Sequence, residues 1–289
     1  MIESNRFDVL IIGAGQAGIP LAHALTKAGK RVALAEEKDL GGSCVNFGCT
    51  PTKAVIASAR VARLARRGKE FGLKIPTVEI DFPAVLERAK QILIESRTSL
   101  QKGFEKTDNP KLLHGSAHFD GRDTDAFRMT VGDRLVVAEQ VVLDTGTRST
   151  IPPIDYRILL SQLAGDGSRT TSARVVPYAI FTDPELGRVG MTESEALKSR
   201  EEIKVARYEM KGNGKARELG ETEGFIKVII DTETNRILGA AVLAAEGAEL
   251  IHLYVDMMNT DAPYTVIREA IHIHPTLAEA IQSAVKSFE

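Results

Sequence analysis

The sequence has no excess of charge of either sign, no long apolar run and only two cysteines. Its 289 residues include 37 Lys and Arg against 39 Asp and Glu, a formal net charge of −2. This balance excludes a protein that binds nucleic acid or a membrane surface mainly by charge attraction. No apolar run approaches the ~20 residues that span a bilayer. The N-terminus lacks the small-residue cleavage site of a signal peptide. We therefore expect a cytoplasmic protein that binds neither nucleic acid nor membrane.

The two cysteines, Cys44 and Cys49, lie close together near the N-terminus. A secreted disulfide scaffold has more cysteines, spread along the chain. A disulfide that closed so short a loop would restrain the unfolded chain little, because loop entropy grows with loop length. Their spacing alone leaves two interpretations open, a redox-active pair and two reduced thiols.

The first 36 residues carry a glycine motif between two strands. Residues 7–12 are a short apolar run typical of a buried parallel strand, and residues 31–35 predict a second one. Between them lie the sequence GAGQAG, residues 13–18, and a helical stretch. A GxGxxG turn between a strand and a helix, with an acidic residue about 20 positions later, is the fingerprint of a dinucleotide-binding fold. Here that acidic residue is Glu36.

Each glycine of the motif has a physical role. Gly13 forms the tight turn, Gly15 lets the backbone approach a diphosphate, and Gly18 lets the helix pack on the strand. The N-terminus of the helix offers N–H groups to the phosphates, and Glu36 would accept hydrogen bonds from ribose hydroxyls. The alternative is a glycine-rich turn without a ligand. The motif by itself does not distinguish FAD from NAD.

Residues 41–53, GGSCVNFGCTPTK, contain both cysteines. This segment resembles the redox-active disulfide motif of the FAD-dependent pyridine nucleotide–disulfide oxidoreductases, which include glutathione reductase, dihydrolipoamide dehydrogenase and mercuric reductase. The resemblance implies that Cys49 is the thiol next to the flavin, that Cys44 exchanges with the substrate and that Lys53 lies beside the flavin. Pro51 predicts a helix that begins just after Cys49, where thiols are more acidic than usual. Lys53 could also be an ordinary exposed lysine of that helix.

Two further segments resemble parts of the FAD site in the same family. Residues 114–117, HGSA, resemble the segment whose backbone contacts adenine, and residues 143–146, LDTG, resemble the turn that closes the first flavin segment. Asp144 replaces the usual alanine in that turn, and we expect it to disturb local packing. The cofactor-binding residues that the resemblance implies are Gly13, Gly15, Gln16, Ala17, Gly18, Glu36, Gly42, Ser43, Cys44, Lys53, Ser116, Ala117, Thr145 and Gly146.

The C-terminal part resembles the dimerisation domain of that family, beginning with residues 176–184 and 189–193. His274, followed by Glu279, resembles the catalytic His–Glu pair, which in the family comes from the partner subunit and faces the cysteines. The resemblance implies a homodimer with a composite site, in which His274 exchanges protons with the thiols and Glu279 orients the imidazole. A structural His274 is the alternative. His272 and His274 could also suggest a metal site, but no other Cys or His cluster lies nearby, so we expect no metal.

Periodicity predicts the remaining elements. Helices are expected at 54–67 and 82–106, and a β-meander at 111–143 with turns at 120–121 and 132–133. Strands are expected at 203–210, 224–231 and 236–244, and helices at 246–258, 264–271 and 277–286. The predicted architecture is an α/β, Rossmann-like FAD-binding domain with a β-meander over residues 1–165, followed by an α+β dimerisation domain over residues 170–289.

Two segments of the family are missing from this sequence. Family members carry a second GxGxxG motif for NAD(P)H and a later Gly-Asp segment that holds the flavin ribityl chain. In the family, a nicotinamide-binding domain separates two stretches of the chain. In this sequence the two corresponding stretches follow each other directly near residues 154–155. Gly165-Asp166 does not replace the Gly-Asp segment, because it follows a helix-like run in a polar turn. The sequence leaves open a natural deletion, an engineered deletion and a mobile domain that the full protein retains.

Three functions are compatible with these patterns. The first is a homodimeric flavoprotein, similar to mercuric reductase, that passes electrons from NAD(P)H through FAD and the Cys44–Cys49 disulfide to a disulfide or related acceptor, with a role in cell redox homeostasis. No second cysteine pair lies near the C-terminus, which argues against Hg(II) itself as the substrate. The second is a FAD-binding dimer core that has no NAD(P)H site and no turnover. The third is an interaction module built on the dimerisation domain.

Overall fold

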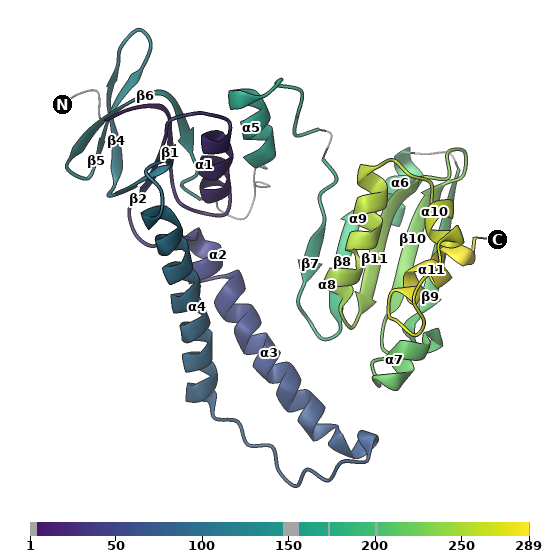
Figure 1. The fold of residues 1–289 in the computed structure, drawn as a ribbon. Coiled ribbons are helices and arrows are strands. Elements are labelled where there is room, and N and C mark those ends of the chain that lie inside the picture. The colour runs from purple at the N-terminus through teal and green to yellow at the C-terminus, as the bar shows by residue number, and fades with distance from the viewer. Residues whose placement is uncertain (1–4, 147–155, 173, 200–201, 289) are drawn as a thin grey trace. The chain divides into compact units, whose positions relative to one another are not determined.

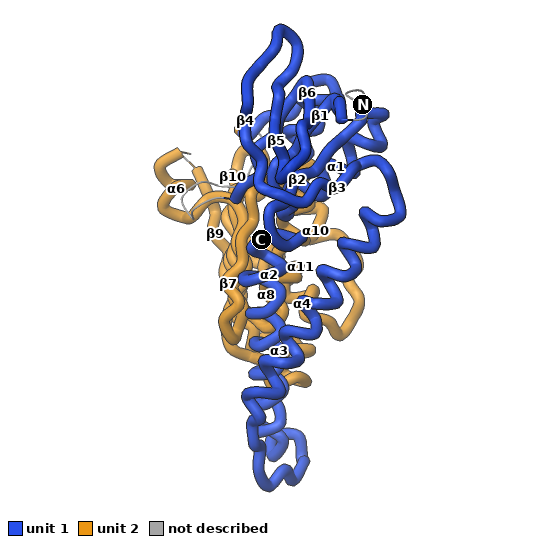
Figure 2. The backbone as a smooth tube through the Cα atoms, turned by 90° about the vertical axis from the view of Figure 1, so that its left-hand side faces the viewer, with its two compact units in different colours: residues 1–171 blue, residues 172–289 orange. Residues whose placement is uncertain are grey.

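The computed structural model describes residues 5–146, 156–172, 174–199 and 202–288 of the chain. It divides into two compact units, residues 1–171 and residues 172–289, which Figure 2 colours separately. Each unit has its own sheet and its own core.

Unit 1 is built on a six-stranded sheet with the strand order β3-β2-β1-β6-β5-β4. Strands β3, β2, β1 and β6 pair in parallel, whereas β6, β5 and β4 pair antiparallel. Strand β6 therefore belongs to both parts of the sheet. The strands are β1 (Arg6–Ile12), β2 (Val32–Glu36), β3 (Lys111–His114), β4 (Ala117–Arg122), β5 (Phe127–Val131) and β6 (Arg134–Leu143).

The parallel strands are buried on both faces, which explains their continuous apolar sequence. Val9 and Ile11 of β1 pack in one cluster with Leu21 of the following helix. Leu10, which points to the opposite face, packs in a second cluster with Met129 of the antiparallel part. This alternation follows from the two-residue period of a strand. The glycine motif is thereby anchored to a rigid sheet.

The helices of unit 1 pack near the parallel part of the sheet or extend from it. Helices α3 and α4 run side by side as a long pair that projects away from the sheet (Figure 1). Asp81 caps the N-terminus of α4, because its Oδ1 accepts a hydrogen bond from Ala84 N at 3.0 Å. The helical elements are α1 (Gly18–Lys27), α2 (Gly42–Asn46), α3 (Cys49–Arg66), the 3₁₀ helix η2 (Gly68–Phe71), α4 (Phe82–Glu105) and α5 (Tyr156–Ala164).

Two local expectations for unit 1 were wrong. Residues 111–114 form β3, which pairs in parallel with β2 and lies outside the meander. The expected turn at residues 120–121 lies inside β4, where the register shifts between Phe119 and Gly121. A bulge there accommodates the glycine without ending the strand. Helix α3 (Cys49–Arg66) combines the helix start expected just after Cys49 and the helix expected at 54–67 in one continuous element.

Unit 2 is a five-stranded antiparallel sheet with the order β7-β8-β11-β10-β9. Its core includes Tyr254 of α9 and Ile281 of α11, both fully buried against the sheet. The two strands at 178–180 and 185–190 had no predicted counterparts. The elements are β7 (Tyr178–Ile180), β8 (Glu185–Gly190), α6 (Glu193–Ser199), β9 (Ile203–Glu209), η3 (Met210–Gly212), α7 (Gly214–Glu218), β10 (Phe225–Asp231), β11 (Ile237–Ala244), α8 (Gly247–Leu250), α9 (His252–Asn259), α10 (Thr265–Glu269) and α11 (Glu279–Lys286).

A helix that crosses a bilayer needs about 20 predominantly apolar residues. Among the described residues, no helix combines enough length with enough apolar character to do so. The longest, α4, has 24 residues, but its sequence includes Glu87, Arg88 and Lys90.

Candidate active site

The glycine motif forms a tight turn between β1 and α1. Gly13 has φ +108°, and its N–H donates to Ala35 O at 2.8 Å. A Cβ atom at Gly13 would lie 2.1 Å from Asp144 O, and one at Gly18 would lie 2.1 Å from Gly13 O. Both positions therefore require glycine, as the motif predicts for a turn in which helix and strand approach closely.

Glu36 lies at the end of β2, beside this turn. Its Oε2 accepts a hydrogen bond from Ala14 N and its Oε1 accepts one from Lys38 N, both at 2.8 Å. These bonds fix the direction of the carboxylate. A carboxylate has about four lone-pair sites, so Glu36 retains acceptor capacity for the hydroxyls of a ribose.

Asp144 follows β6 and reaches the same turn. Its Oδ2 accepts a hydrogen bond from Gly18 N at 2.7 Å. Burial raises the pKa of Asp144, and the nearby charge of Glu36 adds to that effect, while hydrogen bonds from Gly18 N and Gly15 N oppose it. The carboxylate therefore has specific partners in the turn. We expected Asp144 to disturb the packing of the turn, but the structure shows its side chain hydrogen-bonded to Gly18 N.

The cysteine segment docks directly on the glycine turn. Gly41 N donates to Ala14 O at 2.8 Å, and Gln16 Nε2 donates to Gly41 O at 3.3 Å. A Cβ atom at Gly42 would lie 2.8 Å from Gly15 Cα, so the two backbones are in close contact. The redox motif and the dinucleotide turn, more than 20 residues apart in the sequence, thus form one surface.

Asn46 holds the segment together, a role that the sequence analysis missed. This buried side chain donates through Nδ2 to Leu40 O at 3.1 Å and to Gly42 O at 2.8 Å, and it accepts a hydrogen bond from Arg97 Nε. A buried amide that satisfies several backbone carbonyls fixes a loop strongly. The position of Asn46 between Cys44 and Cys49 was the only feature of the sequence from which this role could have been inferred.

The two cysteines are free thiols in this structure. Cys44 lies in α2 and is half-buried, whereas Cys49 is the first residue of α3 and is exposed. Burial, together with the hydrogen bond and charge of Cys49, raises the pKa of Cys44 to about 11. The charge of Lys53, one turn further along α3, acts in the opposite direction. Cys44 is therefore protonated at neutral pH and needs a base before it can react as a thiolate.

The remaining predicted cofactor residues lie at the same edge of the sheet. Ser116 and Ala117 follow β3, and Gly115 N donates to Glu36 O at 2.9 Å. Thr145 and Gly146 follow β6. This edge carries the carboxyl ends of the parallel strands, where open α/β sheets bind their ligands.

A cavity of about 510 Å³ borders the glycine turn. Its wall combines the turn and α1 with residues of α2 and α4, so the cysteine segment and the dinucleotide turn share it. The lining residues are Gly15, Gln16, Ile19, Pro20, Val45, Glu95, Ser96, Ser99 and Leu100. The cavity therefore lies between the glycine turn and the helix that carries Cys44.

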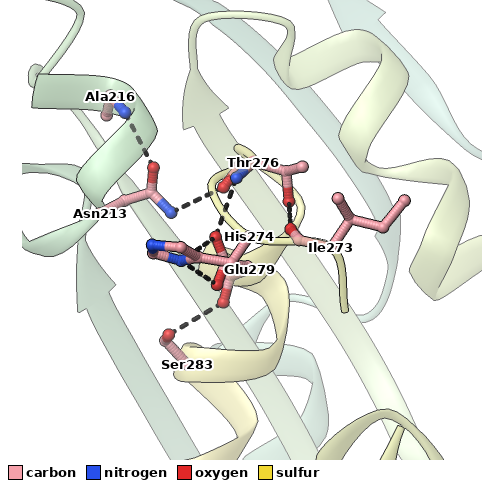
Figure 3. Close-up of polar contacts among 7 residues, drawn as sticks. All are labelled: Asn213, Ala216, Ile273, His274, Thr276, Glu279 and Ser283. Carbon is pink, nitrogen blue, oxygen red and sulfur yellow. Dashed lines mark hydrogen bonds and ion pairs between the residues drawn. The ribbon is translucent and has the colours of Figure 1, made fainter. Parts of the chain in front are cut away.

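Unit 2 carries the predicted histidine–carboxylate pair, shown in Figure 3. His274 Nδ1 lies 2.9 Å from Glu279 Oε1 and 3.2 Å from Oε2, while Thr276 N donates to Glu279 Oε2 at 2.8 Å. The hydrogen bond from Thr276 N, followed by that with His274, lowers the pKa of Glu279. An ionised carboxylate favours the tautomer with a proton on Nδ1, which leaves Nε2 free to accept a proton.

The histidine is open to solvent, and its carboxylate partner is not. The His274 side chain is 76% exposed, against 25% for Glu279. Asn213 anchors the loop, because its Nδ2 donates to Thr276 O at 3.1 Å (Figure 3). Neither Thr276 nor Asn213 was predicted as a positioning residue. Among the described residues, no three His, Cys, Asp or Glu side chains are grouped to hold a metal ion.

The fold and these contacts define a Rossmann-like α/β protein with a cysteine pair beside its glycine turn. Comparison with known families identifies it further. The model of the pyridine nucleotide-disulphide oxidoreductases matches residues 7–174, and the model of their dimerisation domain matches residues 176–285. The chain therefore belongs to the pyridine nucleotide-disulphide oxidoreductase family, a family of enzymes, and the predicted fold class is confirmed.

Individual relatives differ in how much of the chain they match. A probable pyridine nucleotide-disulfide oxidoreductase from Escherichia coli, RclA, is 38% identical over 128 residues, 44% of this chain and 29% of RclA. A dihydrolipoyl dehydrogenase from Haloferax volcanii is 26% identical over 293 residues, 96% of this chain and 60% of that enzyme. The chain thus spans at most about 60% of the length of these two relatives.

Solved structures support the same fold. The Cu(II) complex of the HOCl-induced flavoprotein disulfide reductase RclA from Escherichia coli has a TM-score of 0.76 and 19% identity, covering 99% of this chain and 100% of that one. LpdA from Mycobacterium tuberculosis has a TM-score of 0.83 and 14% identity, covering 98% and 99%. At these identities the likeness shows the fold alone.

Proposed function

We propose that this chain is a FAD-dependent disulfide oxidoreductase that uses Cys44 and Cys49 as its redox pair and NAD(P)H as its electron donor. The observation that carries the proposal is the direct contact between the cysteine segment and the glycine turn at Gly42 and Gly15. A cofactor bound at that turn would lie next to the redox pair. The acceptor in this proposal is a disulfide or a related small molecule. Similarity to mercuric reductase remains a prediction from residues 181–184.

The cofactor, when bound, supplies the two-electron link between NAD(P)H and the cysteine disulfide. Two electrons and two protons then convert the disulfide to two thiols. A base removes the Cys44 proton, and the thiolate attacks the acceptor disulfide to form a mixed disulfide and release one thiol. Cys49 then attacks Cys44, which restores the disulfide and releases the second thiol.

The proton transfers belong to the His274–Glu279 pair in this proposal. The raised pKa of Cys44 makes a base necessary, and the hydrogen bond at His274 Nδ1 leaves Nε2 available for the proton. The imidazole would later return that proton to the departing thiolate. Following the family resemblance, we assign this pair to the partner subunit's copy of the chain.

A homodimer in the cytoplasm is part of the same proposal. Unit 2 matches the family's dimerisation domain, and Ile271 and Ile273, which flank His272, are 100% and 80% exposed. Fully exposed isoleucines beside a catalytic histidine favour a surface that a second copy covers. Such a dimer would complete two composite sites and act in cell redox homeostasis.

Two cysteine variants test the redox assignment. On reduction with dithionite or NADPH, the flavin-loaded wild type should develop a long-wavelength absorbance from a thiolate in contact with the flavin. Cys49→Ser should lose this absorbance because it removes the thiol assigned to the flavin side. Cys44→Ser, the matched control, should keep it. A band that persists in Cys49→Ser contradicts the assignment.

A FAD-binding dimer without turnover is the second candidate, favoured by the missing second GxGxxG motif. Oxidation of NADPH coupled to a disulfide or quinone acceptor separates the two candidates. Turnover by the flavin-loaded chain excludes the second candidate. Bound FAD without turnover would support it.

A further inference from the structure

Asp144 occupies hydrogen-bond donors that a dinucleotide would use. Its carboxylate accepts a hydrogen bond from Gly18 N at Oδ2, at 2.7 Å, and another from Gly15 N. The main chain holds the residue there, because Asp144 N donates to Ile12 O at 2.7 Å. These donors lie at the N-terminal end of α1, where a helix attracts anions. A carboxylate of the chain itself is thus already bound at this point.

The carboxylate also fills space beside Gly15. A Cβ atom built on Gly15 would lie 3.2 Å from Asp144 Oδ2, and one built on Gly18 would lie 2.9 Å from it. The second glycine of the motif is small so that the diphosphate can approach the backbone. Asp144 therefore stands next to the position that the diphosphate requires.

The charges around the turn do not compensate for this carboxylate. Glu36 adds a second negative charge, since its Oε2 accepts a hydrogen bond from Ala14 N in the same turn. Burial and the charge of Glu36 raise the pKa of Asp144, and the groups that oppose them are the backbone N–H groups of Gly18 and Gly15. A bound diphosphate would add further negative charge at short range, which is unfavourable where solvent screening is incomplete.

We propose that Asp144 competes with the diphosphate of a bound dinucleotide and that its charge sets the affinity of this site for FAD. The inference rests on the proposed function, because FAD is the cofactor assigned there. In the empty site the carboxylate accepts hydrogen bonds from Gly18 N and Gly15 N. In the loaded site it faces the diphosphate and weakens binding. Removing its charge should therefore strengthen binding.

The test compares the cofactor-free wild-type chain with two variants. Asp144→Asn removes the charge and keeps an oxygen that can accept from Gly18 N. Asp144→Ala removes both. FAD is titrated by its fluorescence, and ADP, which carries the diphosphate without the flavin, is titrated by calorimetry. We expect the Kd for both ligands to fall by about tenfold in both variants, which corresponds to ~1.4 kcal/mol.

A matched control removes a negative charge elsewhere on the same strand. Glu139 lies in β6 and forms an exposed ion pair with Arg6 at 3.2 Å. It lies near the start of β1, since Ala138 and Gln140 are in register with Phe7 and Val9. Glu139→Gln should leave both Kd values unchanged. An equal fall in Glu139→Gln would show that net charge, and not the position of Asp144, sets the affinity.

The outcomes separate this inference from the proposed function. FAD binding by the wild type, with an equal or higher Kd in both Asp144 variants, overturns the inference alone. Tighter ADP binding in the variants, with no FAD binding by any chain, supports the inference and overturns the proposed cofactor. No binding of either ligand by any chain overturns both.

Discussion

Asp144 and Glu279 are two carboxylates whose pKa values shift in opposite directions because their surroundings differ. Asp144 is partly buried in unit 1, and burial favours its neutral form. Glu279 accepts hydrogen bonds from Thr276 N and His274, which favour its charged form. Each pKa shift makes the free energy of unfolding depend on pH. The dependence has one sign for Asp144 and the opposite sign for Glu279.

For Asp144, a raised pKa in the folded protein means that stability is lost as pH rises through that pKa. Asp144→Asn has no charge to bury and keeps the acceptor for Gly18 N. We therefore expect the cofactor-free variant to gain stability relative to wild type as the pH rises from about 4 through the range in which Asp144 ionises. Urea unfolding across this range measures the difference. A difference that does not change with pH contradicts the assignment.

For Glu279, a lowered pKa in the folded protein means that stability is present at neutral pH and is lost as pH falls through that pKa. Glu279→Gln should thus be less stable than wild type at pH 7, and the two should converge below about pH 4. Unfolding midpoints at several pH values test this. Glu233→Gln, an exposed position in the same unit, is the control and should follow the wild type throughout. A gap that persists at low pH would show a steric effect.

At the scale of elements, the contact between α2 and the glycine turn organises unit 1. Gly41 and Gly42 have φ +97° and +60°, which lets the chain enter α2 directly against Gly15. The same short helix carries Cys44, and α3 begins at Cys49. The placement of both thiols therefore depends on two left-handed glycines and on the close approach of two backbones.

Gly42→Ala tests this contact. Gly29→Ala is the matched control, because Gly29 also has a positive φ of +83° but has open space where a Cβ would be. Backbone strain alone should reduce the stability of Gly29→Ala by about 1–2 kcal/mol. Gly42→Ala adds a clash with Gly15 Cα and should lose about 2–5 kcal/mol. Denaturant unfolding measures both. Equal losses would show that the close approach contributes nothing.

Sequence patterns predicted the elements well where the signal was local. The apolar runs of β1, β2, β10 and β11 fall within one or two residues of their predicted ends. The start of α3 was indicated by Pro51, because proline is favoured in the first turn of a helix. The prediction placed a turn at Gly121, inside β4, because a glycine in a bulge cannot be distinguished from a turn glycine by sequence pattern.

At the scale of the whole molecule, the two units carry different parts of the proposed chemistry. Unit 1 contains the thiols and the dinucleotide turn, and unit 2 contains His274 and Glu279. If the partner subunit supplies the histidine, then turnover requires the dimer but FAD binding does not. Substitutions at the exposed Ile271 and Ile273 test whether turnover depends on the dimer.

The double variant Ile271→Asp and Ile273→Asp should be monomeric, because charged side chains oppose burial at an interface. We expect it to retain the wild-type ratio of FAD to chain and to lose disulfide reduction. Light scattering measures the oligomeric state, flavin absorbance measures the ratio of FAD to chain, and NADPH oxidation with a disulfide acceptor measures the activity. Leu197→Asp, at an exposed apolar position of α6, should remain dimeric and active. A verified monomer with the wild-type specific activity contradicts the composite site.

Local patterns and backbone sterics were enough to predict the family, the class of each domain and the turn that Gly13 and Gly18 require. The cofactor and catalytic residues that the resemblance implied remain predictions. Which side chains and backbone groups contact one another became visible only in the folded molecule. Asn46 donates a hydrogen bond to Gly42 O within the cysteine segment. Asp144 accepts one from Gly18 N, although the two residues are 126 positions apart in the sequence. Thr276 N donates to the carboxylate of Glu279. Contacts of this kind depend on where strands end in space, which residue patterns along the chain do not encode.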